Sequence, residues 1–348
     1  MNSPSPNTDF SPDIQLEYRD NFARHILRVT LYIQSEVMNT LMLKHDHSQL
    51  RTTYVPYITI AADRGARLSD IAEMLGISRQ AANKTVNQIE AAGYLQRAAD
   101  PSDARAKLLV TTPEAKAMIR QGGVEAMKLQ NRFAEIVGDK ELALANASIV
   151  QLIDQLDLSF PFESNKVPNL SAVLPRLSDF ITGRLQSLTM AKGHPKLKRS
   201  FGSVLTAIGP AGGRIQQIAN TRNVSKQAIS AIASELEELG YIRRQPLPAD
   251  VRQVVLLFTD KGQELIADGV ASVHELAQAF SDLIGEHELQ QLNEVMARIY
   301  RSLHLEHDIF DHADSNDIRI VARQVKRQLG EDGAKALARL LLSNDSNY

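Results

Sequence analysis

The pattern of hydrophobic and polar residues between positions 67 and 112 predicts two short helices followed by a β-hairpin. Apolar side chains recur at helical spacing in the first helix, at Leu68, Ile71, Ala72 and Leu75. Gly76 ends this helix, and Ser78 suits the cap of a second, amphipathic helix over 79–92. Residues 94–98 and 107–112 then show strand patterns on either side of a turn-forming stretch. Helix, tight turn, helix and hairpin together predict a winged helix-turn-helix.

The same pattern occurs a second time, 147 residues further along the chain. Residues 50–122 align without a gap with residues 197–269, and 20 of the 73 aligned pairs are identical. The identities are clustered: Ser78, Gln80 and Ala81 match Ser225, Gln227 and Ala228; Glu90, Gly93, Tyr94 and Arg97 match Glu237, Gly240, Tyr241 and Arg244; Pro101, Asp103 and Arg105 match Pro248, Asp250 and Arg252. The repeat has the size of a domain rather than of a solenoid unit, so it suggests a dimer fused into one chain.

Helical patterns flank both copies of the repeat. The predicted flanking helices cover 14–43 and 114–160 around the first copy, and 171–190 and 259–304 around the second. The expected organisation is a disordered lead-in (1–12), a first winged-helix domain (13–160), a linker (161–170), a second winged-helix domain (171–307) and a helical C-terminal extension (308–348). The expected fold class is mainly α with small β-hairpin wings. Two winged helix-turn-helix domains and a helical dimerisation-type region would form an intramolecular pseudo-dimer.

Composition narrows the class of protein. The chain of 348 residues is long enough for two domains, and it has no run of 18 apolar residues that would predict a membrane helix. Cysteine is absent, which excludes cysteine-ligated metal and fits a reducing compartment, so we predict a cytoplasmic protein. The net charge is −2, so any positive charge that meets nucleic acid must be local. No phosphate-binding loop or nucleophile elbow is present, and we predict neither an enzyme nor a cofactor.

Several motifs of the first copy are repeated in the second. In the first copy they are Leu68-Ser69-Asp70-Ile71-Ala72, Gly76-Ile77-Ser78, the run 90–97 and Asp103-Ala104-Arg105. In the second they are Ile218-Ala219, Val224-Ser225, the run 236–244 and Asp250-Val251-Arg252. Together these motifs resemble the MarR family of bacterial transcriptional regulators. The resemblance implies a regulator that binds double-stranded DNA with two winged helices. It also implies a dimer made by the terminal helices, and release of DNA when a small, often aromatic carboxylate binds.

The second helix of each copy is the expected recognition helix in the major groove, and each hairpin is the expected wing. The predicted DNA-binding residues are Arg79, Gln80, Asn83, Lys84, Asn87, Asp103, Arg105 and Lys107 in the first copy, and Lys226, Gln227, Ser230, Ser234, Asp250 and Arg252 in the second. Gln80 and Asn83 can pair with adenine edges, and Arg105 would reach the minor groove. By resemblance, Asp103 would hold the Arg105 guanidinium in a charge-assisted pair. The alternative without DNA binding is that the polar face of the helix is simply solvated and that Asp103 and Arg105 form a surface ion pair that contributes little.

The two copies differ at these positions. Asn83, Lys84 and Asn87 become Ser230, Ala231 and Ser234, and Lys107 becomes Val254. We therefore predict an intact second fold with weaker or altered DNA contact, acting on an asymmetric operator whose half-sites lie about 10 bp apart. The alternative is a winged-helix module that binds a protein partner, or an anti-repressor, with weak or no DNA binding.

The sequence contains three weaker candidates for function. His25, Arg28 and Tyr32 lie at spacings of three and four and could line a pocket for a small aromatic or anionic effector, although interface packing is favoured. A histidine-rich segment with His304, His307, Asp308, Asp311 and His312 could hold a metal ion, but a solvated helix end is favoured and we assign no metal. Residues 317–342 predict a helical hairpin that either packs on the pseudo-dimer or joins two chains, with a basic face.

Overall fold

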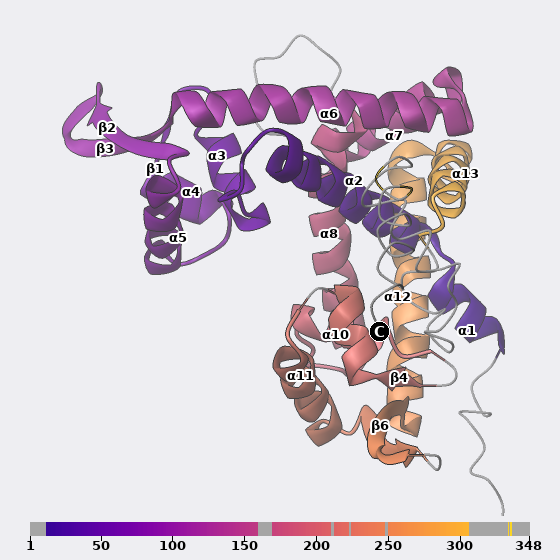
Figure 1. Ribbon diagram of the computed structural model, residues 1–348. Helices are drawn as coiled ribbons and strands as arrows, with labels where there is room; N and C mark the ends of the chain where they lie inside the picture. The colour runs from indigo at the N-terminus through magenta and orange to yellow at the C-terminus, as the bar shows by residue number, and fades with distance from the viewer. Residues whose placement is uncertain are drawn as a thin grey trace, which may run out of the picture. The chain divides into compact units, whose positions relative to one another are not determined.

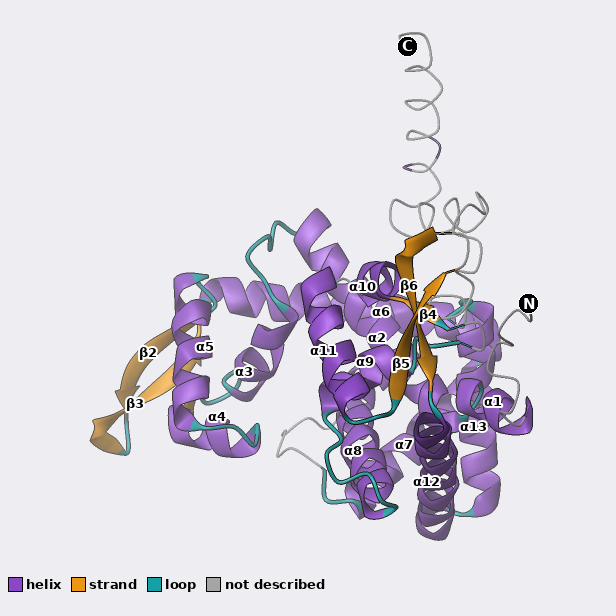
Figure 2. Ribbon diagram, turned by 90° about the horizontal axis from the view of Figure 1, so that it is seen from below, coloured by secondary structure: helices purple, strands orange, loops and turns teal. Residues whose placement is uncertain are grey.

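The computed structural model describes residues 12–158, 169–209, 212–222, 224–247 and 250–305, together with positions 333 and 335. These residues form helices and two three-stranded antiparallel sheets (Figures 1 and 2). The chain divides into two compact units, each described here by itself. The larger comprises 10–199 and 264–305, and the smaller contains 200–263. The units cut across the sequence repeat, because helices from both copies pack together in the larger one.

The first winged helix lies in the larger unit and follows the predicted order. Its elements are a 3₁₀ turn (Thr52–Tyr54), α3 (Val55–Ile60), β1 (Ala66–Arg67), α4 (Leu68–Met74), α5 (Arg79–Ala91), β2 (Leu95–Asp100) and β3 (Asp103–Thr111). The strands are ordered β1-β3-β2. Gly76 turns the chain after α4 with a φ of +63°, and the Ser78 hydroxyl accepts a hydrogen bond from Ala81 N at the start of α5. The predicted helix-turn-helix and hairpin are confirmed.

The helical region of the larger unit is built from both copies. The first copy gives α1 (Pro12–Arg19), α2 (Phe22–Lys44), α6 (Pro113–Val137) and α7 (Asp139–Gln155). The second gives α8 (Leu170–Ala191), most of α12 (Asp260–Ile284) and α13 (Glu286–Ser302). The exchange is reciprocal: α13 of the second copy packs on α2 of the first, and α7 of the first packs on α8 of the second (Figure 1). Such pairing is what a two-fold dimer interface requires, here within one chain.

A single apolar core joins these helices. Fully buried side chains come from both copies, among them Val29, Ile149, Leu174, Ile181 and Met296. Phe22 of α2 meets Phe280 of α12 edge to face, with ring centroids 5.9 Å apart. Since Leu, Ile and Phe side chains of the two copies fill one core, neither set of helices can bury its apolar face without the other.

The smaller unit contains the second winged helix. Its described elements are α9 (Gly202–Leu205), β4 (Gly213–Arg214), α10 (Ile215–Arg222), α11 (Lys226–Glu238), β5 (Ile242–Leu247) and β6 (Asp250–Phe258), after a 3₁₀ turn at Arg199–Phe201. The strand order is β4-β6-β5, and the pairing Ile242↔Phe258 repeats Leu95↔Thr111 at the same offset of 147 residues. Both wings therefore share one register, although most side chains differ.

Several predictions fall outside the described residues. These are the lead-in except residue 12, the linker except residues 169 and 170, and the extension except positions 333 and 335. Asn169 caps α8, which begins at Leu170. Among the helices of the described ranges, none combines the length and apolar character needed to cross a membrane.

Candidate nucleic-acid interface

Helix α5 has the two faces that the sequence predicted. Ala82, Val86 and Ile89 are fully buried against the winged-helix core. The predicted DNA-binding side chains of this helix are all exposed: Arg79, Gln80, Asn83, Lys84 and Asn87. Because the buried stripe fixes the rotation of the helix, the polar face is held outward.

An arginine of the wing organises part of this polar face. Arg97 on β2 donates from Nη2 to Asn83 Oδ1 at 3.2 Å and to Asn87 Oδ1 at 3.0 Å. Its Nη1 lies 3.1 Å from Glu90 Oε2, so an acidic residue of α5 anchors it. The sequence patterns predict no role for Arg97, and the recurrence of Glu90 and Arg97 as Glu237 and Arg244 is the sequence signal that points to one.

A second arginine fixes the wing to the body of the domain. Arg67 of β1 donates from Nε to Asp100 Oδ2 at 2.7 Å, and its Nη2 lies 2.6 Å from the same oxygen. Asp100 also accepts from the Ser102 backbone N–H at 2.8 Å and from the Ser102 hydroxyl at 2.7 Å. The Ser102 hydrogen bonds, followed by Arg67, lower the pKa of Asp100 to about 2. The ionised carboxylate is therefore the hub of the wing turn.

The structure corrects the predicted pairing of Asp103 with the Arg105 guanidinium. Asp103 Oδ1 accepts from the backbone N–H of Arg105 at 3.0 Å, and Oδ2 lies 3.9 Å from Arg67 Nη2. An aspartate side chain in a turn is short, and it commonly accepts a hydrogen bond from the backbone N–H two residues further on. Asp103 makes this local contact with Arg105 rather than a contact with its guanidinium. Asp103 thus shapes the tip, while Arg105 and Lys107 are exposed beside it.

The recognition helix of the second copy has a different surface. Lys226 and Gln227 are exposed, whereas Ser230 and Ser234 are half-buried. Arg244 donates from Nη2 to Ser234 Oγ at 3.0 Å and to the Ser230 carbonyl at 3.2 Å, and it pairs with Glu237. The Ser234 hydroxyl itself donates to the Ser230 carbonyl at 3.0 Å. The single donor of that hydroxyl and one of its two acceptor lone pairs are therefore used within the domain.

Charge also separates the two recognition helices. Helix α5 carries two basic residues, Arg79 and Lys84, and one acidic residue, Glu90. Helix α11 carries one basic residue, Lys226, and three acidic residues: Glu235, Glu237 and Glu238. A helix with excess negative charge meets phosphate less favourably.

The second wing lacks one part of the first. Leu247 stands where the first wing has Asp100, although Arg214 keeps the place of Arg67. Asp250 and Arg252 lie on β6, and their side chains fall outside the described part of the structure. The second wing therefore has no carboxylate at the position equivalent to Asp100.

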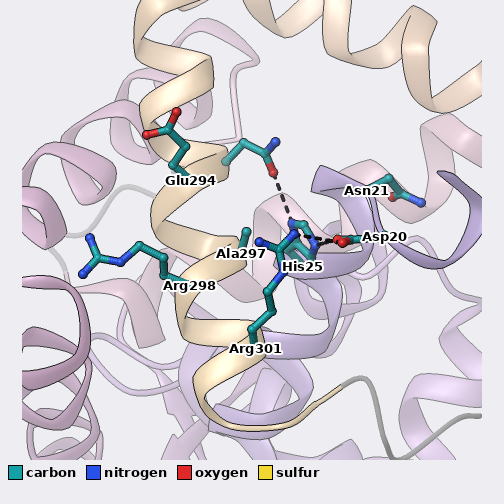
Figure 3. Close-up of a pocket in the computed structure, with 8 residues that line it drawn as sticks. Asp20, Asn21, His25, Glu294, Ala297, Arg298 and Arg301 are labelled. Carbon is teal, nitrogen blue, oxygen red and sulfur yellow. Dashed lines mark hydrogen bonds and ion pairs between the residues drawn. The ribbon is translucent and has the colours of Figure 1, made fainter. Parts of the chain in front are cut away.

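A polar cavity of about 390 Å³ lies between the start of α2 and the outer face of α13 (Figure 3). The lining residues are Asp20, Asn21, His25, Asn293, Glu294, Ala297, Arg298 and Arg301. His25 is buried, with Nε2 against the Asp20 carboxylate and Nδ1 3.2 Å from Asn293 Oδ1. Burial lowers the pKa of His25, against the opposing effect of its hydrogen bonds to Asp20 and Asn293. Arg301 Nη2 closes the cluster 2.8 Å from Asp20 Oδ2.

The three effector candidates lie differently with respect to this cavity. His25 lines it, but Arg28 donates to the Leu305 carbonyl at 3.2 Å, and Tyr32 Oη accepts from Arg132 Nη1 at 2.7 Å. Of the histidine-rich segment, only His304 is described, and the other four residues lie outside the described ranges. In the part of the chain that the structure describes, no group of three His, Asp or Glu side chains is placed to hold a metal ion.

Both winged helices have counterparts among known protein families. The MarR-family model matches the chain twice. The matched residues are 58–106 and 202–253, which contain the helix-turn-helix and most of the wing in each copy. The chain therefore contains two segments that match the MarR-family model, each at a winged helix, in the tandem arrangement that the sequence predicted.

Comparison with curated proteins finds no match. Several solved structures are similar at low identity. A MarR-family transcriptional regulator from Rhodococcus sp. RHA1 is 22% identical over 39% of this chain and 96% of its own, with a TM-score of 0.30. Streptococcus pneumoniae FabT, solved in complex with DNA, is 18% identical over 37% and 96%, with a TM-score of 0.29. Rhodococcus jostii RHA1 CouR, solved with p-coumaroyl-CoA, is 21% identical over 39% and 95%, with a TM-score of 0.30.

Proposed function

We propose that the protein is a sequence-specific transcriptional regulator that binds double-stranded DNA as a single-chain pseudo-dimer. The observation that supports this most strongly is the exposed polar face of α5. Its buried stripe, its Ser78 cap and its Arg97 brace fix that face in a domain matched by the MarR-family model. Such a helix fits the major groove, with its first turns toward base edges.

The roles of the first copy follow from residue chemistry. Gln80 and Lys84 lie on the exposed face toward the start of α5, where they contact base edges or phosphate. Arg79 contacts phosphate beside them. Arg105 and Lys107 on the wing contact the adjacent minor groove and backbone, where the negative potential attracts cations.

The second copy contributes less sequence recognition. Ser234 is engaged by Arg244, and α11 has three acidic residues against one lysine. Lys226, Gln227 and Arg252 remain for phosphate and groove contacts. The operator is therefore asymmetric, with one half-site that is strongly selected and one that is weakly selected, about 10 bp apart.

We further propose that DNA binding responds to a small effector held in the cavity between α2 and α13. The cavity is lined by α2 of the first copy and α13 of the second, which pack together. A ligand that binds one arrangement of these two helices more tightly than another would shift the protein toward that arrangement. We propose that this shift changes the affinity for DNA. The guanidinium groups of Arg298 and Arg301 line the cavity beside the carboxylates of Asp20 and Glu294, so it suits a small polar ligand whose anionic group the arginines would hold. No catalytic role is proposed.

The function is tested by selecting bound duplexes from a random pool with the full chain, beside Arg105→Ala and Arg252→Ala. Recovery of an asymmetric site, with the larger loss of affinity in Arg105→Ala, supports the proposal. The affinity of the recovered site must also fall as salt rises, because phosphate contacts release counterions. No enrichment at low salt would overturn it in favour of a winged-helix module for a protein partner or an anti-repressor.

A further inference from the structure

The bridge from Arg97 to the two asparagines of α5 bears on which bases the helix can recognise. Asparagine recognises adenine by two hydrogen bonds, in which its oxygen accepts from the N6 amino group and its nitrogen donates to N7. Both asparagine oxygens here already accept from Arg97 Nη2, at 3.2 Å for Asn83 and 3.0 Å for Asn87.

The orientation of these amides follows from the chemistry of the guanidinium. Arginine has only donors, so the amide atom that faces it must be the oxygen. Each Nδ2 amino group is then on the side away from Arg97, and both side chains are exposed. Each oxygen keeps a second lone pair, but an oxygen that already accepts a charge-assisted hydrogen bond is a poorer acceptor for a neutral amino group.

The bridge is held in place from the other side. Arg97 Nη1 lies 3.1 Å from Glu90 Oε2, and Glu90 is half-buried on the same helix. Arg97 itself is on β2, where it pairs in register with the buried Leu109 of β3. The sheet therefore fixes the backbone of Arg97, and the Glu90 carboxylate holds its guanidinium.

We infer that Arg97 is a specificity-determining residue of the first winged helix. It leaves Asn83 and Asn87 as stronger donors than acceptors toward DNA, and such groups select guanine, with its N7 and O6 acceptors, over adenine, with its N6 donor. The inference rests on the proposed DNA-binding function and names a residue that acts without touching DNA. It also replaces the adenine pairing that the sequence alone suggested for Asn83.

The second copy provides an internal comparison. Arg244 makes the same contact with its glutamate, Glu237, but it faces the Ser234 hydroxyl and the Ser230 carbonyl. Neither of these is an amide that could be turned. Of these two equivalent arginines, Arg97 therefore sets base preference in the first copy, whereas Arg244 only braces the wing in the second.

The test is a duplex selection with wild-type full chain, Arg97→Met and the matched control Arg244→Met. Asn83→Ala and Asn87→Ala selections first locate the base pairs that depend on the asparagines. At these base pairs we expect wild type to prefer guanine, and Arg97→Met to move the guanine-to-adenine ratio toward adenine by about fivefold or more. Arg244→Met should leave the ratio there unchanged.

Asn83→Asp gives a second variant that keeps an oxygen for Arg97 and so preserves the brace. It removes the Nδ2 donor, and the guanine preference at its base pair should be lost while the circular dichroism and melting temperature stay close to wild type. Adenine preference in the wild type, or the same ratio in Arg97→Met, would overturn the inference alone. Absence of any enriched sequence with the wild-type chain would instead overturn the DNA-binding function.

Discussion

Arg67 and Asp100 join the first strand of the winged helix to the tip of its wing through two contacts, at 2.7 Å from Nε and 2.6 Å from Nη2. Asp100 is buried, and it gathers two further hydrogen bonds from Ser102. The wing is therefore held by a carboxylate whose charge is part of the fold.

This hub predicts an acid-sensitive wing. The pKa of Asp100 is about 2 in the folded protein against 3.8 as the ordinary value, so the folded state binds the proton less tightly. Its contribution to stability is present above pH 3.8 and is lost as the pH falls through about 2. Asp100→Asn should lower the melting temperature at pH 5 and show a smaller further loss on acidification than wild type. Melts between pH 5 and pH 2 check this.

The control for the acid prediction is Asp103→Asn. Asp103 is exposed and lies 3.9 Å from Arg67, so its removal should change the acid dependence less than Asp100→Asn does. Equal pH dependence in wild type and Asp100→Asn would show that the carboxylate is not the hub of the wing.

Arg105 supplies a second prediction, on affinity rather than stability. The side chain is exposed on β3 beside the wing turn, and the Asp103 contact is to its backbone, so the guanidinium is available to DNA. Arg105→Ala should weaken binding to the selected operator about tenfold and reduce the slope of log affinity against log salt by about 1. Titrations at several salt concentrations measure both.

Lys128→Ala is the matched control for Arg105→Ala, because Lys128 is an exposed cation on α6 paired with Glu125 at 2.7 Å. It should leave the salt slope unchanged. A loss of affinity in Lys128→Ala as large as that in Arg105→Ala would point to a general charge effect rather than a wing contact.

Much of the fold could be predicted from sequence because its signals are local or repeated. The buried stripe of α5, the Ser78 cap and the turn at Gly76 each depend on residues a few positions apart. The 147-residue offset then located the second winged helix, whose strands have the register of the first.

The side-chain contacts could not be predicted from the sequence, because they join residues that are far apart in it. Arg67 meets Asp100 across 33 positions, and His25 meets Asn293 across 268. Periodicity carries no information on such pairs. His47 shows the same limit, because it is buried against Tyr94 at 3.1 Å and Gln121 at 2.7 Å, and no pattern in the sequence indicates these partners. Its counterpart at the repeat offset, His194, meets Asp268 at 2.9 Å.

The buried stripe of α5 gives a third prediction. Ile89 is fully buried in the winged-helix core, and Ile89→Ala should lower the stability of that domain by about 2–5 kcal/mol through lost burial and the remaining cavity. Gln88→Ala, at the neighbouring exposed position, should stay within about 0.5 kcal/mol. Denaturant titrations of both variants decide. An equal effect of the two would contradict the assigned rotation of α5.

The histidine between the two copies gives the last prediction. Burial lowers the pKa of His25 below 6.5, so the folded state binds a proton less readily than the unfolded chain. Stability therefore rises with pH from the folded pKa up to about 6.5, and it falls when the protein is acidified through that window. Asp20 and Asn293 oppose the shift, while Arg301 favours it, so the sign rests on burial in the interface of α2 and α13.

His25→Gln keeps a polar side chain at this position and removes the titration. We expect thermal melts between pH 5 and 8 to show a smaller pH dependence in His25→Gln than in wild type. His274→Gln is the matched control, because His274 is exposed and pairs with Glu17 at 3.0 Å. If His274→Gln reduced the pH dependence as much as His25→Gln did, the buried histidine could not be its source. Since His25 joins helices of both copies, a pH effect specific to it would also show that the interface of the pseudo-dimer contributes to the measured stability.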